Sequence, residues 1–235
     1  MDIQGLINKL VQQYNTDELV LGLVLIGSIP KGYHDEHSDI DLEIVVTEER
    51  YYEQKKHHQT FIHTSQYDLI FTTIDKLQQL KDSKKDEEHW AYQDCQVLLD
   101  KTGKLKEILK QITKFDAYSR TERLKRYYLG YWQNMLASMT CVKRHNTLAA
   151  KIYASHSIQD LIRLLFNFND RCAPKLQWAF KELPLLQKKP KNLEAQVANI
   201  LEEPDSHIQS KLWDEIAELL REEEYSGVDH PEEIL

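Results

Sequence analysis

LIGSIPKGYHDEHSDIDLEIVV, residues 25–46, is the stretch on which the interpretation of this chain depends. It begins in an apolar run that ends at Gly27, passes through a polar loop, and enters a second apolar run. The second run alternates strictly between acidic and aliphatic residues, with Asp39, Asp41 and Glu43 at every other position. A period of two predicts a β-strand that carries the acids on one face and the aliphatic residues on the other.

Two carboxylates on one face of a strand require a partner of opposite charge. Asp39 and Asp41 point the same way, so they repel each other, and burying either one unpaired is costly. A divalent metal satisfies both, and carboxylate oxygens are donors that Mg²⁺ and Mn²⁺ favour. Asp68, in the predicted strand QYDLIF at residues 66–71, supplies a third carboxylate toward the same cleft. These three acids are the expected metal ligands and catalytic residues.

The first apolar run ends at Gly27-Ser28, and a helical turn is expected to start at Ile29-Pro30. Proline suits the first turn of a helix, where its missing N–H is not needed. The unpaired backbone N–H groups of such a turn, together with the Ser28 hydroxyl, form a site for terminal phosphate groups. Lys31 lies near enough to add positive charge. The chain has no GxxxxGK[ST] motif, so this segment is not a P-loop.

The composition is that of a globular chain. Of the 235 residues, 41% are hydrophobic and 29% are charged, enough for one large domain or two modest ones. No apolar run approaches the roughly 18 residues of a membrane helix, and a secretory signal is not evident at the N-terminus. The three cysteines are far apart and form no CxxC pair, which argues against disulfides and cysteine-bound zinc. We therefore expect a cytoplasmic protein without a membrane partner.

Charge is distributed unevenly along the chain. The net charge is −8, but residues 101–191 contain 19 Lys/Arg and 6 Asp/Glu, a local net charge of +13 that leaves −21 elsewhere. Basic and aromatic residues interleave in RLKRYYLGYW at residues 123–132. A solvated helical face explains this pattern better than a nucleic-acid groove, so nucleic acid is not an expected partner. The same charge suits an anionic small ligand such as a nucleoside triphosphate.

Hydrophobic periodicity changes near residue 113, from short strands to long helical segments. We predict an α+β fold, in which a small mixed-sheet domain at residues 1–113 is followed by an all-α helical bundle domain at residues 114–235. The expected strands lie within residues 19–28, 39–46, 60–74 and 94–105, and the principal helices at residues 3–14, 117–145, 148–168 and 207–224.

The segment GSIPKGYHDEHSDIDLEI, residues 27–44, resembles the signature of the DNA polymerase beta-like nucleotidyltransferase superfamily. In that family, Gly-Ser is followed after ten residues by Asp-x-Asp. Gly32 stands where the family usually has a second glycine, Lys31 where it often has arginine, and Ser38 directly before the first aspartate. A third acid on a later strand, here Asp68, is also a family feature.

The layout of the whole chain resembles small bacterial antibiotic nucleotidyltransferases and their relatives, which have a C-terminal helical domain. The segment LLFNFNDRCAPKLQW, residues 164–178, resembles part of that second domain and includes Lys175. One departure is Ile29-Pro30, which stands where the family often has a polar and a small residue, and where proline removes a backbone donor.

The resemblance implies a mechanism. The family moves a nucleoside monophosphate from a triphosphate, here ATP or another nucleoside triphosphate, to an acceptor hydroxyl and releases pyrophosphate. Two Mg²⁺ ions, with Mn²⁺ as an alternative, assist this displacement. Asp39 and Asp41 would hold both ions, and Asp68 would bind the ion nearest the attacking hydroxyl and could also serve as the general base, as a carboxylate near this place does in some relatives. The expected nucleotide-binding residues are Gly27, Ser28, Lys31, Ser38 and, from the helical domain, Lys175.

The acceptor is left open by the sequence. We expect the hydroxyl of a small molecule, and the helical domain would bind it. The alternative is a protein tyrosine, modified as in antitoxin-like relatives that transfer AMP to a protein. The local charge of +13 disfavours a cationic aminoglycoside. The long helices are compatible with a homodimer.

Three competing interpretations explain less. A glycosyltransferase would use Asp-x-Asp but would leave the Gly-Ser at its fixed distance unexplained. An RNase of the type that partners such antitoxins would carry Arg-x4–6-His, which the helical half lacks. The pair His34-x-x-His37 resembles a transition-metal site, but it lies in the polar loop before the acids and is more simply solvated.

Overall fold

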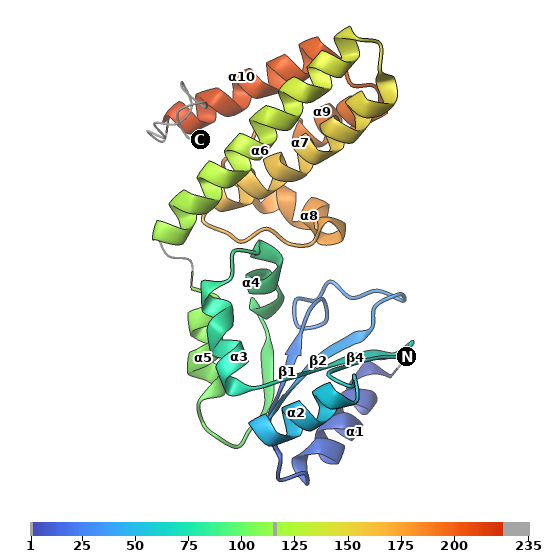
Figure 1. Ribbon diagram of the computed structural model, residues 1–235, viewed down its shortest axis with the longest axis vertical. Coiled ribbons are helices and arrows are strands. Elements are labelled where there is room, and N and C mark those ends of the chain that lie inside the picture. Colours follow the sequence, from blue (N-terminus) through green and yellow to red (C-terminus); the bar gives the residue numbers. More distant parts are fainter. Residues whose placement is uncertain (1, 115–116, 223–235) are drawn as a thin grey trace. The chain divides into compact units, whose positions relative to one another are not determined.

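The computed structural model describes residues 2–114 and 117–222 (Figure 1). The chain divides into two compact units, residues 1–114 and 115–235, and the described part of each has its own hydrophobic core. The first unit combines a five-stranded sheet with helices, and the described part of the second contains only helices and their connections. The predicted α+β fold is confirmed.

The sheet of the first unit is mixed. Its strands lie in the order β3-β4-β2-β1-β5, and β2 and β4 run parallel, whereas the other three pairings are antiparallel. Because β2 and β4 are parallel, both begin at the same end of the sheet. The strands are β1 (Val20–Ile26), β2 (Ile40–Val46), β3 (Phe61–His63), β4 (Tyr67–Thr72) and β5 (Gln96–Asp100).

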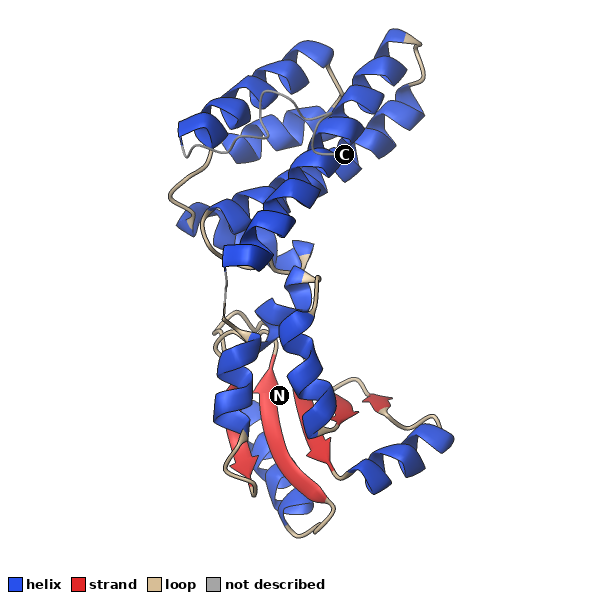
Figure 2. Cartoon of the chain, turned by 60° about the vertical axis from the view of Figure 1, so that its left-hand side comes forward, coloured by secondary structure: helices blue, strands red, loops and turns tan. Residues whose placement is uncertain are grey.

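Helices cover both faces of this sheet (Figures 1 and 2). Ile40 and Leu42 of β2 are buried on the face that α1 and α2 cover. Val45 is buried on the opposite face, against α3, α4 and α5. The alternation predicted for residues 39–46 is therefore confirmed. The helices of this unit are α1 (Ile3–Asn15), α2 (Glu48–Lys56), α3 (Ile74–Gln79), the 3₁₀ turn η1 (Leu80–Asp82), α4 (Asp86–Tyr92) and α5 (Leu105–Ile112).

The second unit is built around two long helices, α6 and α7, which a short turn joins and which lie side by side (Figure 1). Tyr128 of α6 and Phe166 of α7 are fully buried between the helices. Trp213 packs on Tyr128 with ring centroids 5.3 Å apart. The elements are α6 (Ala117–Lys143), α7 (Thr147–Phe168), α8 (Leu176–Glu182), the 3₁₀ turn η2 (Leu183–Leu185), α9 (Leu193–Glu202) and α10 (Ser206–Glu222).

The long helices expected from periodicity are confirmed. Those predicted at residues 3–14, 117–145 and 148–168 correspond to α1, α6 and α7. The helix predicted at residues 207–224 corresponds to α10, and its last two residues lie outside the described part of the chain. Among the described helices, none combines the length and the apolar character that a bilayer crossing requires.

Candidate active site

The parallel pairing of β2 and β4 brings the three predicted acids to one end of the sheet. Asp39 directly precedes β2, Asp41 is the second residue of β2, and Asp68 is the second residue of β4. Asp41 and Asp68 are register partners, so their side chains leave the same face on strands about 4.8 Å apart. All three acids are only partly buried, which leaves their carboxylates accessible to a ligand.

The structure adds a histidine to this group. His63 of β3 is the register partner of Asp68 in the antiparallel pairing, and its Nδ1 lies 2.6 Å from Oδ1 of Asp68. Asp39, His63 and Asp68 each place one potential ligand atom within 4.8 Å of the other two. His63 was not among the site residues predicted from the sequence. The predicted turn at Ser65-Gln66 contained the signal, because a turn centred there pairs position 63 with position 68.

Asp41 faces a different neighbour, the end of β1. Gly27 has a φ of +80°, and a Cβ added to it would lie 2.2 Å from Oδ2 of Asp41. The backbone therefore passes directly beside the carboxylate, and both the positive φ and the close approach require glycine. This contact joins the two halves of the predicted motif, the Gly-Ser turn and the acids, at one point of the sheet.

The chain turns sharply after β1. The N–H of Gly32 donates to the carbonyl of Ile29, and the N–H of Tyr33 donates to the carbonyl of Ser28, each at 3.0 Å. Gly32 has a φ of +70°. This pair of bonds, with a left-handed glycine, is the pattern that closes a single helical turn. Ser28 is buried at the start of the turn.

Two other predicted nucleotide-binding residues of the first unit are engaged by the protein itself. The Lys31 side chain is 3% exposed, and its ammonium group contacts the carbonyl of Gln93 and lies 4.7 Å from the centre of the Trp90 ring. The Ser38 hydroxyl accepts from the N–H of Asp35 at 2.9 Å and donates to its Oδ1 at 3.1 Å. Both contacts hold the loop between the turn and the acids.

In a comparison with known protein families, residues 4–116 match the family model described as "Nucleotidyltransferase domain". The first unit is a nucleotidyltransferase domain. The expected superfamily and enzyme class are thus confirmed for this unit.

One solved structure that the chain resembles is the nucleotidyltransferase-like protein from Exiguobacterium sibiricum 255-15. The two are 13% identical, the match covers 92% of this chain and 78% of that one, and the TM-score is 0.46. A search of curated proteins finds no match.

Below the acids, the nucleotidyltransferase domain contains a buried carboxyl group. Glu43 lies on the same face of β2 as Asp41, two residues further along the strand, and is 3% exposed. Burial raises the pKa of Glu43 to about 7, although a hydrogen bond from the Tyr92 hydroxyl at 2.5 Å acts in the opposite direction. The same burial, together with the charge of Glu43, raises the pKa of Tyr92. The alternating pattern placed Glu43 on this face, but its burial depends on Tyr92, which comes from a distant part of the chain.

The donor set of the nucleotidyltransferase domain fits a divalent cation. Asp39 and Asp68 converge from two neighbouring strands, and the negative charges that they bring together favour binding of a cation between them. Asp41 projects from the same face beside them. Carboxylate oxygens in this number are the usual ligands of Mg²⁺ and Mn²⁺ at sites that also bind phosphate.

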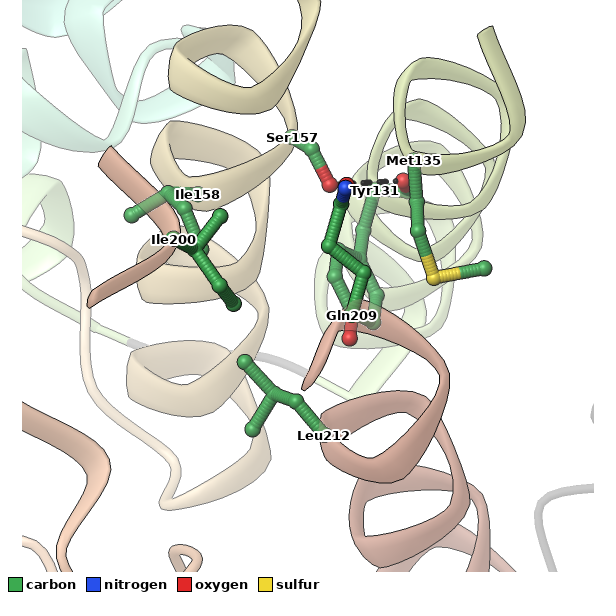
Figure 3. Close-up of a pocket in the computed structure, with 7 residues that line it drawn as sticks. All are labelled: Tyr131, Met135, Ser157, Ile158, Ile200, Gln209 and Leu212. Carbon is green, nitrogen blue, oxygen red and sulfur yellow. Dashed lines mark hydrogen bonds between the residues drawn. The ribbon is translucent and has the colours of Figure 1, made fainter. Parts of the chain in front are cut away.

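The second unit contains a small pocket between α6, α7, α9 and α10 (Figure 3). The Tyr131 hydroxyl and Nε2 of Gln209 point into the interior there, and neither atom has a hydrogen-bond partner among the described residues. The space has no room for even a water molecule, whereas ligand pockets begin at roughly 300 Å³. It is therefore a packing gap within the bundle. Its lining residues are Tyr131, Met135, Ser157, Ile158, Ile200, Gln209 and Leu212.

The last predicted site residue, Lys175, belongs to this second unit. It immediately precedes α8, and its side chain is exposed. Asn169, in the same segment, holds the chain locally: its Oδ1 accepts from the N–H groups of Gln187 and Lys188 at 3.0 Å and 2.9 Å. The segment that resembles the family's second domain thus comprises the end of α7, a connection that Asn169 fixes, and the start of α8, and it leaves Lys175 at the surface of its own unit.

Proposed function

We propose that this nucleotidyltransferase acts in the cytoplasm and moves a nucleoside monophosphate, AMP from ATP, to a hydroxyl group of a small molecule with release of pyrophosphate. The observation that carries the proposal is the parallel register of Asp41 with Asp68, which gathers three acids at the sheet end where the Gly27 turn begins. Acids beside an anion-binding turn suit metal-assisted phosphoryl chemistry.

In this proposal, Asp39 and Asp41 hold two Mg²⁺ ions, and Asp68 shares one of them. When bound, the ions neutralise the triphosphate and make the α-phosphorus more electrophilic. Ser28 binds the β- and γ-phosphates through its backbone N–H and its hydroxyl, and Gly27, whose own N–H donates to the carbonyl of Ala91, gives the chain the turn that brings the phosphates beside the acids. Asp68 would also accept the proton of the acceptor hydroxyl.

The remaining predicted residues act on the shape and charge of the nucleotide site. Lys31 and Ser38 fix the loop that joins the phosphate-binding turn to the acids, since their polar groups are engaged by Gln93 and Asp35. Lys175 adds a positive charge from the helical unit, which also binds the acceptor. A neutral or anionic hydroxyl compound suits the basic residues of that unit better than a cationic one.

Asp41→Asn tests the proposal. Non-hydrolysable ATP and GTP analogues are titrated calorimetrically into the wild type and the variant, with and without Mg²⁺. We expect ATP binding that requires Mg²⁺ in the wild type and disappears in Asp41→Asn, with transfer reduced on the order of 100-fold or more. The melting temperature of the metal-free variant should equal or exceed that of the wild type, because one repulsive charge is removed.

Asp75→Asn, an exposed aspartate of α3 in the same domain, is the matched control and should leave binding unchanged. Metal-independent binding in the wild type, or full turnover in Asp41→Asn, would contradict the proposed metal site.

A further inference from the structure

His63 stands among the acids although neither the predicted mechanism nor the family signature uses it. We propose that His63 is a nitrogen ligand to the metal ion that Asp39 and Asp68 hold, and that this ion site prefers a divalent transition metal such as Mn²⁺ to Mg²⁺. The inference rests on the proposed function, because it concerns one of the ions of the same active site.

The β3–β4 hairpin determines where His63 points. Directly opposed residues of an antiparallel pair project from the same face, and His63 is opposite Asp68. Asp68 in turn lies beside Asp41 on β2, so the three strands present their polar side chains on one face. The ring of Phe61, two residues earlier on β3, stacks with that of His63 at 6.4 Å and an interplanar angle of 18°, which orients the imidazole.

The distances suit a shared ion. Ligand atoms on one ion lie at most about 4.2 Å apart when each bond is about 2.1 Å long. The ligand atoms of Asp39, His63 and Asp68 all lie within 4.8 Å of one another, so small side-chain rotations bring them onto one ion. The close pairing of His63 Nδ1 with Asp68, at 2.6 Å, is then replaced by bonds from both residues to the metal.

Stability of the fold does not account for the pair. His63 is 67% exposed in its side chain, and such solvated ion pairs contribute only about 0–1 kcal/mol. Asp68 is 18% exposed and lies next to Asp39, so the cluster collects negative charge on the accessible end of the sheet. Metal binding does account for it, because the imidazole and the two carboxylates are all groups that can coordinate one metal ion.

The nitrogen ligand has a consequence for the choice of metal. Mg²⁺ prefers oxygen ligands and keeps several waters, whereas imidazole raises the affinity for first-row transition metals. A site of two carboxylates alone would therefore favour Mg²⁺ more than a site that includes His63. His63 becomes the residue that determines metal specificity.

The test compares His63→Phe with the wild-type full-length chain. Phenylalanine keeps an aromatic ring on the strand and has no nitrogen. Mn²⁺ alone is titrated by electron paramagnetic resonance, and Mg²⁺ by competition. We expect Mn²⁺ to bind His63→Phe about 10-fold more weakly, whereas the Mg²⁺ affinity changes less than about twofold because Mg²⁺ gains little from nitrogen.

Pulsed electron paramagnetic resonance supplies a second readout, which does not depend on the affinity for Mn²⁺. The Mn²⁺ signal of the wild type should show modulation from imidazole ¹⁴N, which disappears in His63→Phe and in wild-type protein labelled with [¹⁵N]histidine. His57→Phe, the same substitution at an exposed histidine of the same unit, is the matched control and should retain the modulation.

Two results would overturn the inference. If His63→Phe binds Mn²⁺ as tightly as the wild type and the wild type shows no ¹⁴N modulation, His63 is not a ligand, while the metal site of the proposed function stands. If the wild type binds neither Mn²⁺ nor Mg²⁺, with or without the ATP analogue, the proposed function fails together with the inference.

Discussion

Asp41 and Glu43 are chemically similar acids two positions apart on one strand face, yet their surroundings give them different properties. Asp41 reaches the open end of the sheet beside Gly27, where it is only partly buried. Glu43 lies in the core, where burial raises its pKa to about 7 despite the hydrogen bond from Tyr92, so that a proton replaces the countercharge that burial would otherwise demand. On the same strand, Asp41 is therefore accessible to a ligand, whereas Glu43 is part of the core.

Glu43→Gln tests whether burial raises the pKa of this carboxyl group. Between pH 4.5, the ordinary pKa of the carboxyl, and pH 7, the folded chain retains a proton that the unfolded chain has released. The contribution of Glu43 to stability therefore falls as pH rises through this window and is fully lost above it. Glutamine still accepts from Tyr92 and does not titrate, so the variant should be more stable than the wild type at pH 8, by on the order of 3 kcal/mol.

The free energies of unfolding are measured by urea titration at pH 5 and pH 8. The difference between variant and wild type should be small at pH 5 and larger at pH 8. An equal difference at both pH values would show that Glu43 titrates normally. Glu49→Gln, an exposed change on α2, should produce no comparable pH dependence.

At the scale of elements, Lys31 connects the turn after β1 to the end of α4. The C-terminal end of a helix carries partial negative charge, and Gln93 directly follows α4. The Lys31 ammonium group therefore acts as a cap for α4 and also rests on the ring of Trp90, with its side chain almost completely buried. The loop that binds the phosphates in our proposal depends on this attachment.

Lys31→Met keeps most of the buried stem and removes the charge. We expect a loss of about 1–3 kcal/mol in the free energy of unfolding, because a charge-assisted hydrogen bond and the contact with Trp90 disappear. Urea titration measures the loss, with the exposed Lys106→Met as control. Unchanged stability combined with much weaker ATP binding would contradict this role and would mean that Lys31 contacts the phosphates directly.

At the scale of the whole molecule, charge is divided between two compact units with separate hydrophobic cores. The acids gather at the sheet of the first unit, whereas residues 101–191, mostly in the second, have a net charge of +13. A nucleotide with bound Mg²⁺ presents both a metal, which needs carboxylates, and phosphates, which need cations. The exposed Lys175 of the second unit is the cation that our proposal assigns to the nucleotide.

Lys175→Ala tests the role that our proposal gives to this lysine. Removing its charge should weaken binding of Mg²⁺-ATP about fivefold, equivalent to ~1 kcal/mol, without changing the melting temperature, because the side chain is exposed. Lys151→Ala, an exposed lysine of α7, is the control. Calorimetry that gives the same affinity for Lys175→Ala and the wild type would mean that the first unit binds the nucleotide without Lys175.

The parts of this molecule that local pattern determines were predictable. The alternation around Asp41 placed the acids on one face, and helical periodicity located α6 and α7. The family model that matches residues 4–116 agrees with the Gly-Ser and Asp-x-Asp spacing. Each of these features depends on neighbours within a few residues or on a fixed distance along the chain.

The features that were missed depend on contacts between distant segments. His63 joins the acids only through the register of a three-residue edge strand, which periodicity does not resolve. The direction of Lys31 depends on α4, which lies about 60 residues later, and the burial of Glu43 depends on Tyr92 of the same helix. Packing between distant segments of the same chain thus overrides what a local motif suggests.

The close approach of Gly27 to Asp41 has a consequence for anyone who wishes to redesign this enzyme. Position 27 has no room for a side chain while an aspartate occupies position 41, because an added Cβ would lie 2.2 Å from its oxygen. The shape of the phosphate turn and the identity of the acid are therefore a coupled pair, and changes at the two positions will not be additive. Varying both positions together would not relieve this, because a φ of +80° still disfavours a side chain at position 27, so a library should keep Gly27 and Asp41 and vary the residues around them.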